Sequence, residues 1–419
     1  MCGIAGFLSN EVWKQDSDLS WIEEISTSLS RIPAGSSEIV KLRDPVDSLI
    51  KRFDQLMEFS FHFELVSSPG FFSRVENLAN LLEKALDRIS TAPPSEEIEA
   101  LRQDIGDFIW QFRAEVLKNV ARTNELITPK LLEKSANRAQ RFVAWSIERV
   151  LENIDRLEVR GRDSAGISVQ CLVDKDSLMQ RISATGKERV LGKRSRVENG
   201  VKISFQGMEL GPRGFVLTFV YKVANLVGHL GDNTRLIRDV VRNDDELWKI
   251  AAFTQNINII AHTRWASNGI ISLANCHPVD GELYEKENIE SIADKDAQFV
   301  LNGDVDNYHD LVENVVHSRG YQIEPSVTTD AKILPVFYRL GTSLSQPNVK
   351  RFGELMNSCE GSLAIVMQHP MFPDELVMGQ KGSGQSLFVG EPLDGFILAS
   401  EVYGLAAWTR KCLALSGLE

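Results

Sequence analysis

The spacing of apolar residues changes sharply along the chain, and this change limits the folds that it can adopt. From about residue 44 to residue 160 apolar residues recur at intervals of three and four, as in SRVENLANLLEKALDRI and AQRFVAWSIERVLENIDRL, which predicts three or four long amphipathic helices. Two prolines followed by Ser95 and two glutamates predict a turn near residues 92–95, with Ser95 as the N-cap of the next helix. A helical block therefore separates the first residues from everything after Gly161.

Short strand-like runs lie on both sides of this helical block. Residues 3–8 form an apolar run before it, and the runs after residue 161 include AGISVQCLV, VKISFQG, NINIIAHT, AQFVLNG, SLAIVMQ and GFILASE. We expect a second helical region at about 218–250. Strict alternation of strand and helix is absent, so the pattern predicts an α+β layered domain rather than a doubly wound parallel sheet.

Composition and charge argue against several classes of function. The 419 residues are 43% hydrophobic and 25% charged, which is typical of a globular chain with a sizeable core. Lys and Arg number 46 against 58 Asp and Glu, so the net charge of -12 offers no basic field for nucleic acid or an anionic membrane. No apolar run approaches the roughly 20 residues that span a bilayer, and no leader-like segment opens the chain. We expect a cytoplasmic protein without nucleic-acid or membrane partners.

The five cysteines direct attention to the start of the chain. They are odd in number and widely spaced, without a C-x-x-C pair, so neither a disulfide framework nor a structural zinc site is expected. Removal of Met1 would give Cys2 both a thiol and an α-amine, and an amine with a pKa of about 7.7–8.0 can accept the thiol proton near neutral pH. The alternative is that Cys2 is a small apolar residue at the start of a buried strand.

Several segments, in order, resemble the class II glutamine amidotransferases, which are N-terminal-nucleophile hydrolases. They are MCGIAGF at the N-terminus, RGRDSAG at 160–166, AHTRWASNG at 261–269, LNGDVDNYHDL at 301–311 and SVTTDAKIL at 326–334. The similarity is closest to the glutaminase domain of glutamine:fructose-6-phosphate amidotransferase and covers roughly residues 2–12 and 155–412. It implies an α+β fold, the αββα four-layer sandwich of the N-terminal-nucleophile hydrolases, with a large inserted helical subdomain.

The resemblance also implies catalytic roles. Cys2 is then the nucleophile that attacks the side-chain amide of L-glutamine. The side chain of Asn302 and the backbone N–H of Gly303 stabilise the oxyanion that this attack creates. An Asn-Gly pair is otherwise a common hairpin turn, and a turn of this kind is able to present such donors.

The substrate-binding roles follow in the same way. Arg264 holds the α-carboxylate of glutamine with its guanidinium fork, and Asp330 binds the α-ammonium, although an aspartate at this position also suits a helix N-cap. Trp265 resembles a residue on a loop that closes the site and gates ammonia; the alternative is a core aromatic. Ser267 keeps the hydroxyl of the threonine usual there, whereas Asn268 replaces a histidine. No cofactor and no metal are expected, because the histidines lack zinc-ligand spacing.

The chain departs from this resemblance mainly in the length of its helical block. We expect the amidotransferase domain at residues 1–12 and 155–415 and the inserted helical subdomain at residues 13–154, either packed on one edge of the sandwich or serving as a docking or homodimerisation surface. No sugar-phosphate isomerase domain follows in this chain. The terminal Leu-Glu pair is common where a tag is joined, so we favour a truncation near residue 417.

The function implied is a glutaminase half-reaction. Hydrolysis of L-glutamine through a Cys2 thioester gives glutamate and ammonia, and the ammonia passes to a synthase or isomerase domain, in cis or in trans, that makes an amino sugar phosphate. One alternative is a catalytically silent module that senses glutamine. Another is an N-terminal-nucleophile amidase for a different amide, which would need neither charge of the Arg264 and Asp330 pair.

Overall fold

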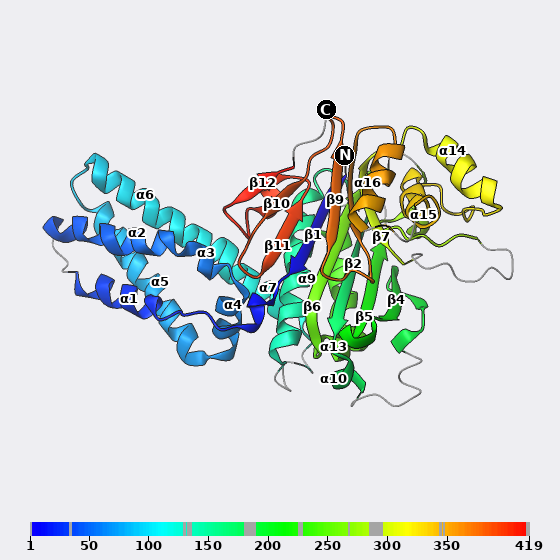
Figure 1. The fold of residues 1–419 in the computed structure, drawn as a ribbon. Coiled ribbons are helices and arrows are strands. Elements are labelled where there is room, and N and C mark those ends of the chain that lie inside the picture. The colour runs from blue at the N-terminus through cyan, green and yellow to red at the C-terminus, as the bar shows by residue number, and fades with distance from the viewer. Residues whose placement is uncertain are drawn as a thin grey trace.

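The chain folds into a sandwich of two antiparallel sheets with a separate group of helices at one side (Figure 1). A computed structural model describes residues 2–32, 36–128, 131, 136–179, 190–224, 229–266, 269–284, 296–342, 346 and 348–415. The helical group comes from the N-terminal third of the chain, and the sandwich is formed by the first strand together with the last two thirds.

Nine of the described strands form the larger sheet, in the order β12-β10-β11-β1-β6-β2-β5-β4-β3. In that order they span Cys412–Ala414, Phe388–Gly390, Gly395–Ala399, Gly3–Ser9, Thr254–Arg264, Ser164–Val173, Phe215–Val223, Val201–Glu209 and Arg194–Glu198. β1 is an inner strand, because it pairs with β6 on one side and with β11 on the other. The N-terminal strand is therefore fixed along both edges, directly after Cys2.

The smaller sheet faces the inner side of the larger one. Its described strands are β7 (Gln298–Gly303), β8 (Leu363–Gln368) and β9 (Leu376–Lys381). Apolar side chains from both sheets meet between them, including Ile4 and Ile260 from the larger sheet and Val300 and Val366 from the smaller one. This interface joins β1 and β6 to β7 and β8.

Helices cover the two outer faces of the sandwich. α9 (Arg138–Leu157), α12 (Asp232–Arg242) and α13 (Asp245–Ala251) pack on the larger sheet, whereas α15 (Ile333–Leu340) and α16 (Asn348–Ser358) pack on the smaller one. The order helix, sheet, sheet, helix confirms the expected α+β fold with four αββα layers. Short helices α10 (Lys175–Met179), α14 (Tyr308–Leu311) and α17 (Val402–Leu405) lie at the ends of strands or in connections.

The helical group has an apolar core of its own. It contains α1 (Trp21–Arg31), α2 (Arg43–Lys51), α3 (Phe53–Leu56), α4 (Phe59–Ser67), α5 (Pro69–Ser90), α6 (Glu96–Gln111) and α7 (Lys118–Leu126). Ser95 caps α6 by accepting a hydrogen bond from the backbone N–H of Ile98 at 3.3 Å, as the sequence predicts. Among the described helices, none combines the length and the apolar composition needed to cross a membrane.

The last helix of the expected insertion packs on the larger sheet and also contacts α4 and α7 of the helical group. α9 is buried along most of its length and contacts β1 and β6. Its buried positions include charged residues such as Glu148 and Arg149 beside the apolar ones. At its N-terminal end Trp13 stacks on Phe142, with ring centroids 4.2 Å apart. The boundary expected at residue 154 stays a prediction, because α9 contacts both the larger sheet and the helical group.

One expected element is wrong in part. Residues 218–223 belong to strand β5 rather than to the helical region expected at 218–250, which begins only at α12. The sequence FVLTFVYKV is almost continuously apolar because both faces of β5 are buried, so the alternation that marks a half-buried strand is missing.

Candidate active site

The strand register brings Cys2 and Arg264 to the same end of the larger sheet. Gly3 of β1 lies opposite Thr263 of β6 in an antiparallel pair, so the residues next to them, Cys2 and Arg264, meet where the two strands end. Gly3 is required there, because a Cβ atom on it would lie 2.6 Å from the Cβ atom of Leu157 in α9. Close packing of β1 on α9 thus fixes the position of the thiol.

The Cys2 thiol forms hydrogen bonds with the backbone of Trp265. The Trp265 N–H donates a hydrogen bond to Sγ at 3.3 Å, and the thiol donates to the Trp265 carbonyl oxygen at 3.6 Å. Burial raises the pKa of the Cys2 thiol, and the negative charge of Asp304 raises it further, while the Trp265 N–H and the charge of Arg264 act in the opposite direction. A nucleophilic thiolate at this position therefore needs a base close by.

Asn302 and Gly303 come from the smaller sheet, and Asn302 contacts the backbone of Cys2. They end β7, and the Asn302 side-chain amide donates to the carbonyl oxygen of Cys2 at 3.1 Å. The amide group carries a second N–H. Gly303 has a φ of +103°, and a Cβ atom on it would lie 1.9 Å from the carbonyl oxygen of Ser362, so only glycine fits this turn.

Arg264 is buried at the end of β6, and Asn275 fixes the loop around it. Arg264 Nη1 donates to the carbonyl oxygen of Ile270 at 3.4 Å, and Asn275 donates to the same oxygen at 3.0 Å. The side-chain oxygen of Asn275 accepts from the backbone N–H groups of Thr328 and Thr329 at 2.7 and 3.0 Å. One amide side chain therefore connects the arginine loop to the segment that leads into Asp330.

Asp330 begins the 3₁₀ turn η8 (Asp330–Lys332) and accepts two backbone hydrogen bonds, from Val305 at 2.7 Å and from Ala331 at 3.0 Å. Its pKa is raised above the ordinary value, because burial and the nearby charge of Asp304 both disfavour the carboxylate. The carboxylates of Asp330 and Asp304 repel each other, and a bound ammonium group would stabilise the charged form of both.

Asp163 is a supporting residue that sequence reasoning missed. Its carboxylate accepts from the backbone N–H of Ala266 at 2.8 Å, and its own N–H donates to the carbonyl oxygen of Arg264 at 3.0 Å. The backbone next to Trp265 is held by these two bonds. The motif signal was present, because Asp163 belongs to RGRDSAG, but its partner lies about one hundred residues away and sequence spacing gives no sign of it.

The remaining predicted residues are placed as follows. The Trp265 side chain is 56% exposed, which argues against the core alternative. Ser267 lies outside the described residues, as does Asn268. His262 is buried, and its Nε2 lies 2.8 Å from the carbonyl oxygen of Leu301; burial lowers its pKa to about 3, so it stays neutral. Within the described part of the chain no group of three or more His, Cys, Asp or Glu side chains could hold a metal ion.

Comparisons with known proteins support the resemblance found in the sequence motifs. The chain, a four-layer α+β fold with a cysteine before an inner strand, resembles the glutamine amidotransferase domains of class II, and the sequence relatives confirm this resemblance. The relatives are glutamine–fructose-6-phosphate aminotransferases. No protein-family model matches the chain.

The similarity to these relatives is low in identity but extends over more than half of the chain. The isomerizing aminotransferase 1 of Rattus norvegicus is 25% identical over 246 residues, 57% of this chain and 27% of that protein. The enzyme of Vibrio vulnificus strain YJ016 is 27% identical over 277 residues, 66% of this chain and 33% of that protein. The chain thus matches about a quarter to a third of the length of these relatives.

A search of solved structures gives weaker likenesses. Glutamine phosphoribosylpyrophosphate amidotransferase from B. subtilis is 14% identical, with a TM-score of 0.36 over 65% of this chain and 43% of that one. At that score the likeness adds nothing to the fold described above.

Proposed function

We propose that the chain hydrolyses L-glutamine to glutamate and ammonia, with Cys2 as the nucleophile. The observation that supports this most is the meeting of Cys2 and Arg264 at the ends of β1 and β6, with Asn302 hydrogen-bonded to the Cys2 backbone. A thiol directly before β1, a guanidinium at the end of β6 and an amide donor near the end of β7 are then held by three regular strands.

Each group has a task in this reaction. Removal of Met1 exposes the α-amine of Cys2, which accepts the thiol proton; the thiolate then attacks the amide carbon of glutamine. The second Asn302 N–H and the Gly303 N–H stabilise the oxyanion. Ammonia leaves with a proton from the ammonium group, and water cleaves the γ-glutamyl thioester to give glutamate and the free thiol.

Recognition of the free amino acid rests on opposite charges. Arg264 would hold the α-carboxylate, and Asp330 with Asp304 close by would hold the α-ammonium. Burial and, after it, repulsion from Asp304 raise the Asp330 pKa, and a bound ammonium group would offset both effects. Such positioning of the amide beside the thiol contributes several kcal/mol to catalysis, on the order of what intramolecular reactions gain. A silent glutamine sensor or an amidase for another amide remains the alternative.

The ammonia formed would be used by an acceptor that is not part of the described structure. The relatives are named as fructose-6-phosphate aminotransferases, so we propose an acceptor domain or partner that makes an amino sugar phosphate. The helical subdomain formed by α1 to α7 is proposed to dock this partner or a second copy of the chain. Trp110 of α6 is 64% exposed on this subdomain.

The function is tested by measuring ammonia and glutamate released from L-glutamine by the purified chain. The wild type and the Cys412→Ala variant, which alters an exposed cysteine far from the site, should produce equal amounts of both. Cys2→Ala should abolish release. Equal release by Cys2→Ala would contradict the proposal, and no release by a wild type with Met1 removed would favour the sensor alternative.

A further inference from the structure

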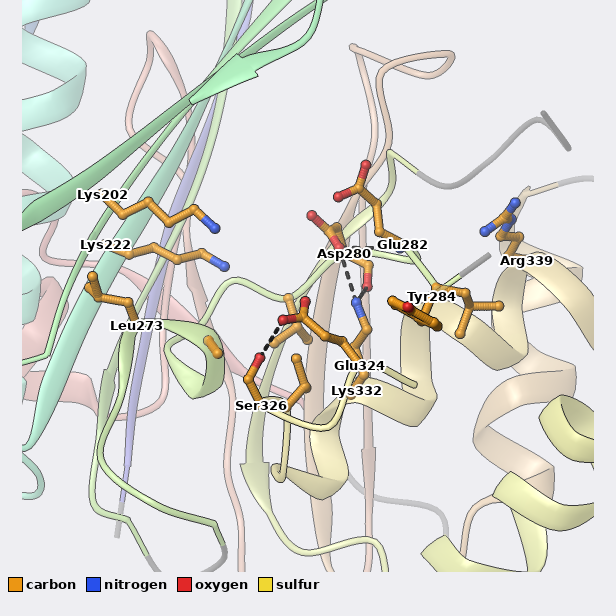
Figure 2. A pocket seen from close by; sticks show the side chains of 14 residues that line it. Lys202, Lys222, Leu273, Asp280, Glu282, Tyr284, Glu324, Ser326, Lys332 and Arg339 are labelled. Carbon is orange, nitrogen blue, oxygen red and sulfur yellow. Dashed lines mark hydrogen bonds and ion pairs between the residues drawn. The ribbon is translucent and has the colours of Figure 1, made fainter. Parts of the chain in front are cut away.

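A polar cavity of about 540 Å³ lies over β4 and β5, away from the strands that contact the smaller sheet. Its other walls are the segments 273–284 and 324–332. A volume of this size is typical of sites for small molecules. Figure 2 shows Lys202 and Lys222 extending side by side from their strands into this cavity.

The two lysines form a like-charged pair without a hydrogen-bonded partner among the residues that the structure describes. Lys202 and Lys222 are directly opposite each other in the β4–β5 pair and point to the same side of the sheet. Like charges in this arrangement destabilise a sheet. Among the described residues, neither ammonium group has a hydrogen bond or an ion pair. Burial lowers the pKa of Lys222, against the attraction of Asp280.

Each carboxylate around the cavity has a partner other than the two lysines, although Asp280 also attracts Lys222. Asp280 accepts from Lys332 Nζ at 3.1 Å, and Figure 2 marks this contact. Glu282 is paired with Lys193, and Glu324 accepts from the Ser326 hydroxyl at 2.7 Å. Arg339 also lines the cavity, where it donates to the carbonyl oxygen of Gly281 at 3.0 Å. Among the described lining residues four side chains are basic and three are acidic, a small excess of positive charge in a chain of net charge -12.

We propose that this cavity binds the phosphate group of a small molecule, held between the ammonium groups of Lys202 and Lys222. A doubly charged phosphate matches two adjacent ammonium groups, and charge-assisted hydrogen bonds to phosphate are stronger than those between neutral groups. The cavity has room for the organic part of a phosphate ester beyond the two lysines.

The walls of this cavity are continuous with the proposed glutamine site. η8 has Asp330 at its first position and Lys332, in the cavity wall, at its last. Leu273 and Ala274 line the cavity immediately before Asn275, the residue that joins the arginine loop to residues 328 and 329. A bound phosphate is therefore expected to change the affinity for glutamine; this coupling rests on the function proposed above.

Binding is tested by calorimetry on the full chain carrying Cys2→Ala, so that the outcome is independent of catalysis. Inorganic phosphate and glycerol 3-phosphate are the probes, and tighter binding of the ester would identify a phosphate ester rather than free phosphate as the ligand. Lys222→Met and Lys202→Met should each weaken binding at least tenfold, whereas Lys249→Met, an exposed lysine of α13, should not. Absent binding, or binding unchanged by both cavity variants, would overturn the proposal.

Thermal unfolding and kinetics add two independent measurements. Because Lys222→Met removes an unpaired charge, it should unfold at the same or a higher temperature without phosphate and lose the stabilisation that phosphate gives. A lower unfolding temperature without phosphate would assign Lys222 a structural role instead. Phosphate should change the KM for glutamine of the active chain at least twofold, and an unchanged KM with intact binding would overturn the coupling alone.

Discussion

The backbone N–H of Trp265 donates a hydrogen bond to the Sγ atom of Cys2 at 3.3 Å. The two residues are 263 positions apart, and the pairing of β1 with β6 brings them together. An N–H pointed at sulfur favours the thiolate, but burial still raises the thiol pKa. The hydrogen bond thus positions the Cys2 thiol, but the thiol still has to lose its proton. We assign the removal of that proton to the α-amine of Cys2.

Arg264→Ala should raise the KM for glutamine strongly. Loss of a charge-assisted hydrogen bond pair to the α-carboxylate costs about 2–3 kcal/mol, which is roughly a 30- to 150-fold increase in KM. Steady-state kinetics of ammonia release measures this. Arg162→Ala, which removes an exposed arginine, is the matched control, and a KM that is unchanged in Arg264→Ala would exclude the proposed clamp.

Asp304→Asn should lower the pKa of the Cys2 thiol, because Asp304 is a negative charge that raises it. The rate of alkylation by iodoacetamide as a function of pH reports the thiol pKa. The measurement is made in a Cys412→Ala background, where the exposed thiol is absent. The alkylation profile should move to lower pH in Asp304→Asn and stay in place in Asp306→Asn; a shift to higher pH in Asp304→Asn would contradict the electrostatic account.

Gly303→Ala should destabilise the protein and abolish activity. The added Cβ atom would lie 1.9 Å from the Ser362 carbonyl oxygen at a φ of +103°, so we expect a loss of about 2–4 kcal/mol in the free energy of unfolding. Gly320 has a φ of +77° with open space around it, and Gly320→Ala should cost only about 1 kcal/mol. Denaturant unfolding compares the two, and equal losses would show that the close approach to Ser362 is unimportant.

Ionisation of the Glu58 carboxyl should lower the free energy of unfolding as the pH rises. Burial, followed by repulsion from Asp394, raises its pKa from 4.5 to about 7, so the folded state prefers the protonated carboxyl. Its contribution is complete below pH 4.5 and is lost as the pH rises through about 7. The free energy of unfolding of the wild type relative to Glu58→Gln should thus fall by about 2–3 kcal/mol between pH 4.5 and 8. The exposed Glu76→Gln should show no such trend, and a flat difference for Glu58→Gln would contradict the assigned pKa.

Much of the sandwich could be predicted from local sequence patterns. Runs such as NINIIAHT and SLAIVMQ coincide with β6 and β8, because short apolar runs between polar turns are specific for strands. The short edge strands β3 and β12 were missed, since exposed edge strands have no apolar face. Residues 218–223 of β5 were predicted to be helical, because both faces of this strand are buried and its sequence lacks the alternation of a half-buried strand.

The candidate site, too, could be predicted only in part from the sequence. Residues inside recognisable motifs, such as Cys2 and Arg264, were proposed from their sequence context, and strand register explains how they meet. Asp163 and Asn275 act by hydrogen bonds to the backbone of distant segments. Bonds of that kind leave no periodic pattern in a single sequence. The lysine pair was missed as well, because the pairing of β4 with β5 alone places Lys202 opposite Lys222.

The most direct test of the central claim is intact-protein mass spectrometry before and after exposure to 6-diazo-5-oxo-L-norleucine, an electrophile shaped like glutamine. The account predicts a mass without Met1 and one covalent adduct, which is absent in Cys2→Ala and present in Cys412→Ala. Retained Met1 with no adduct, or an adduct that persists in Cys2→Ala, would contradict a glutamine-specific N-terminal nucleophile at Cys2.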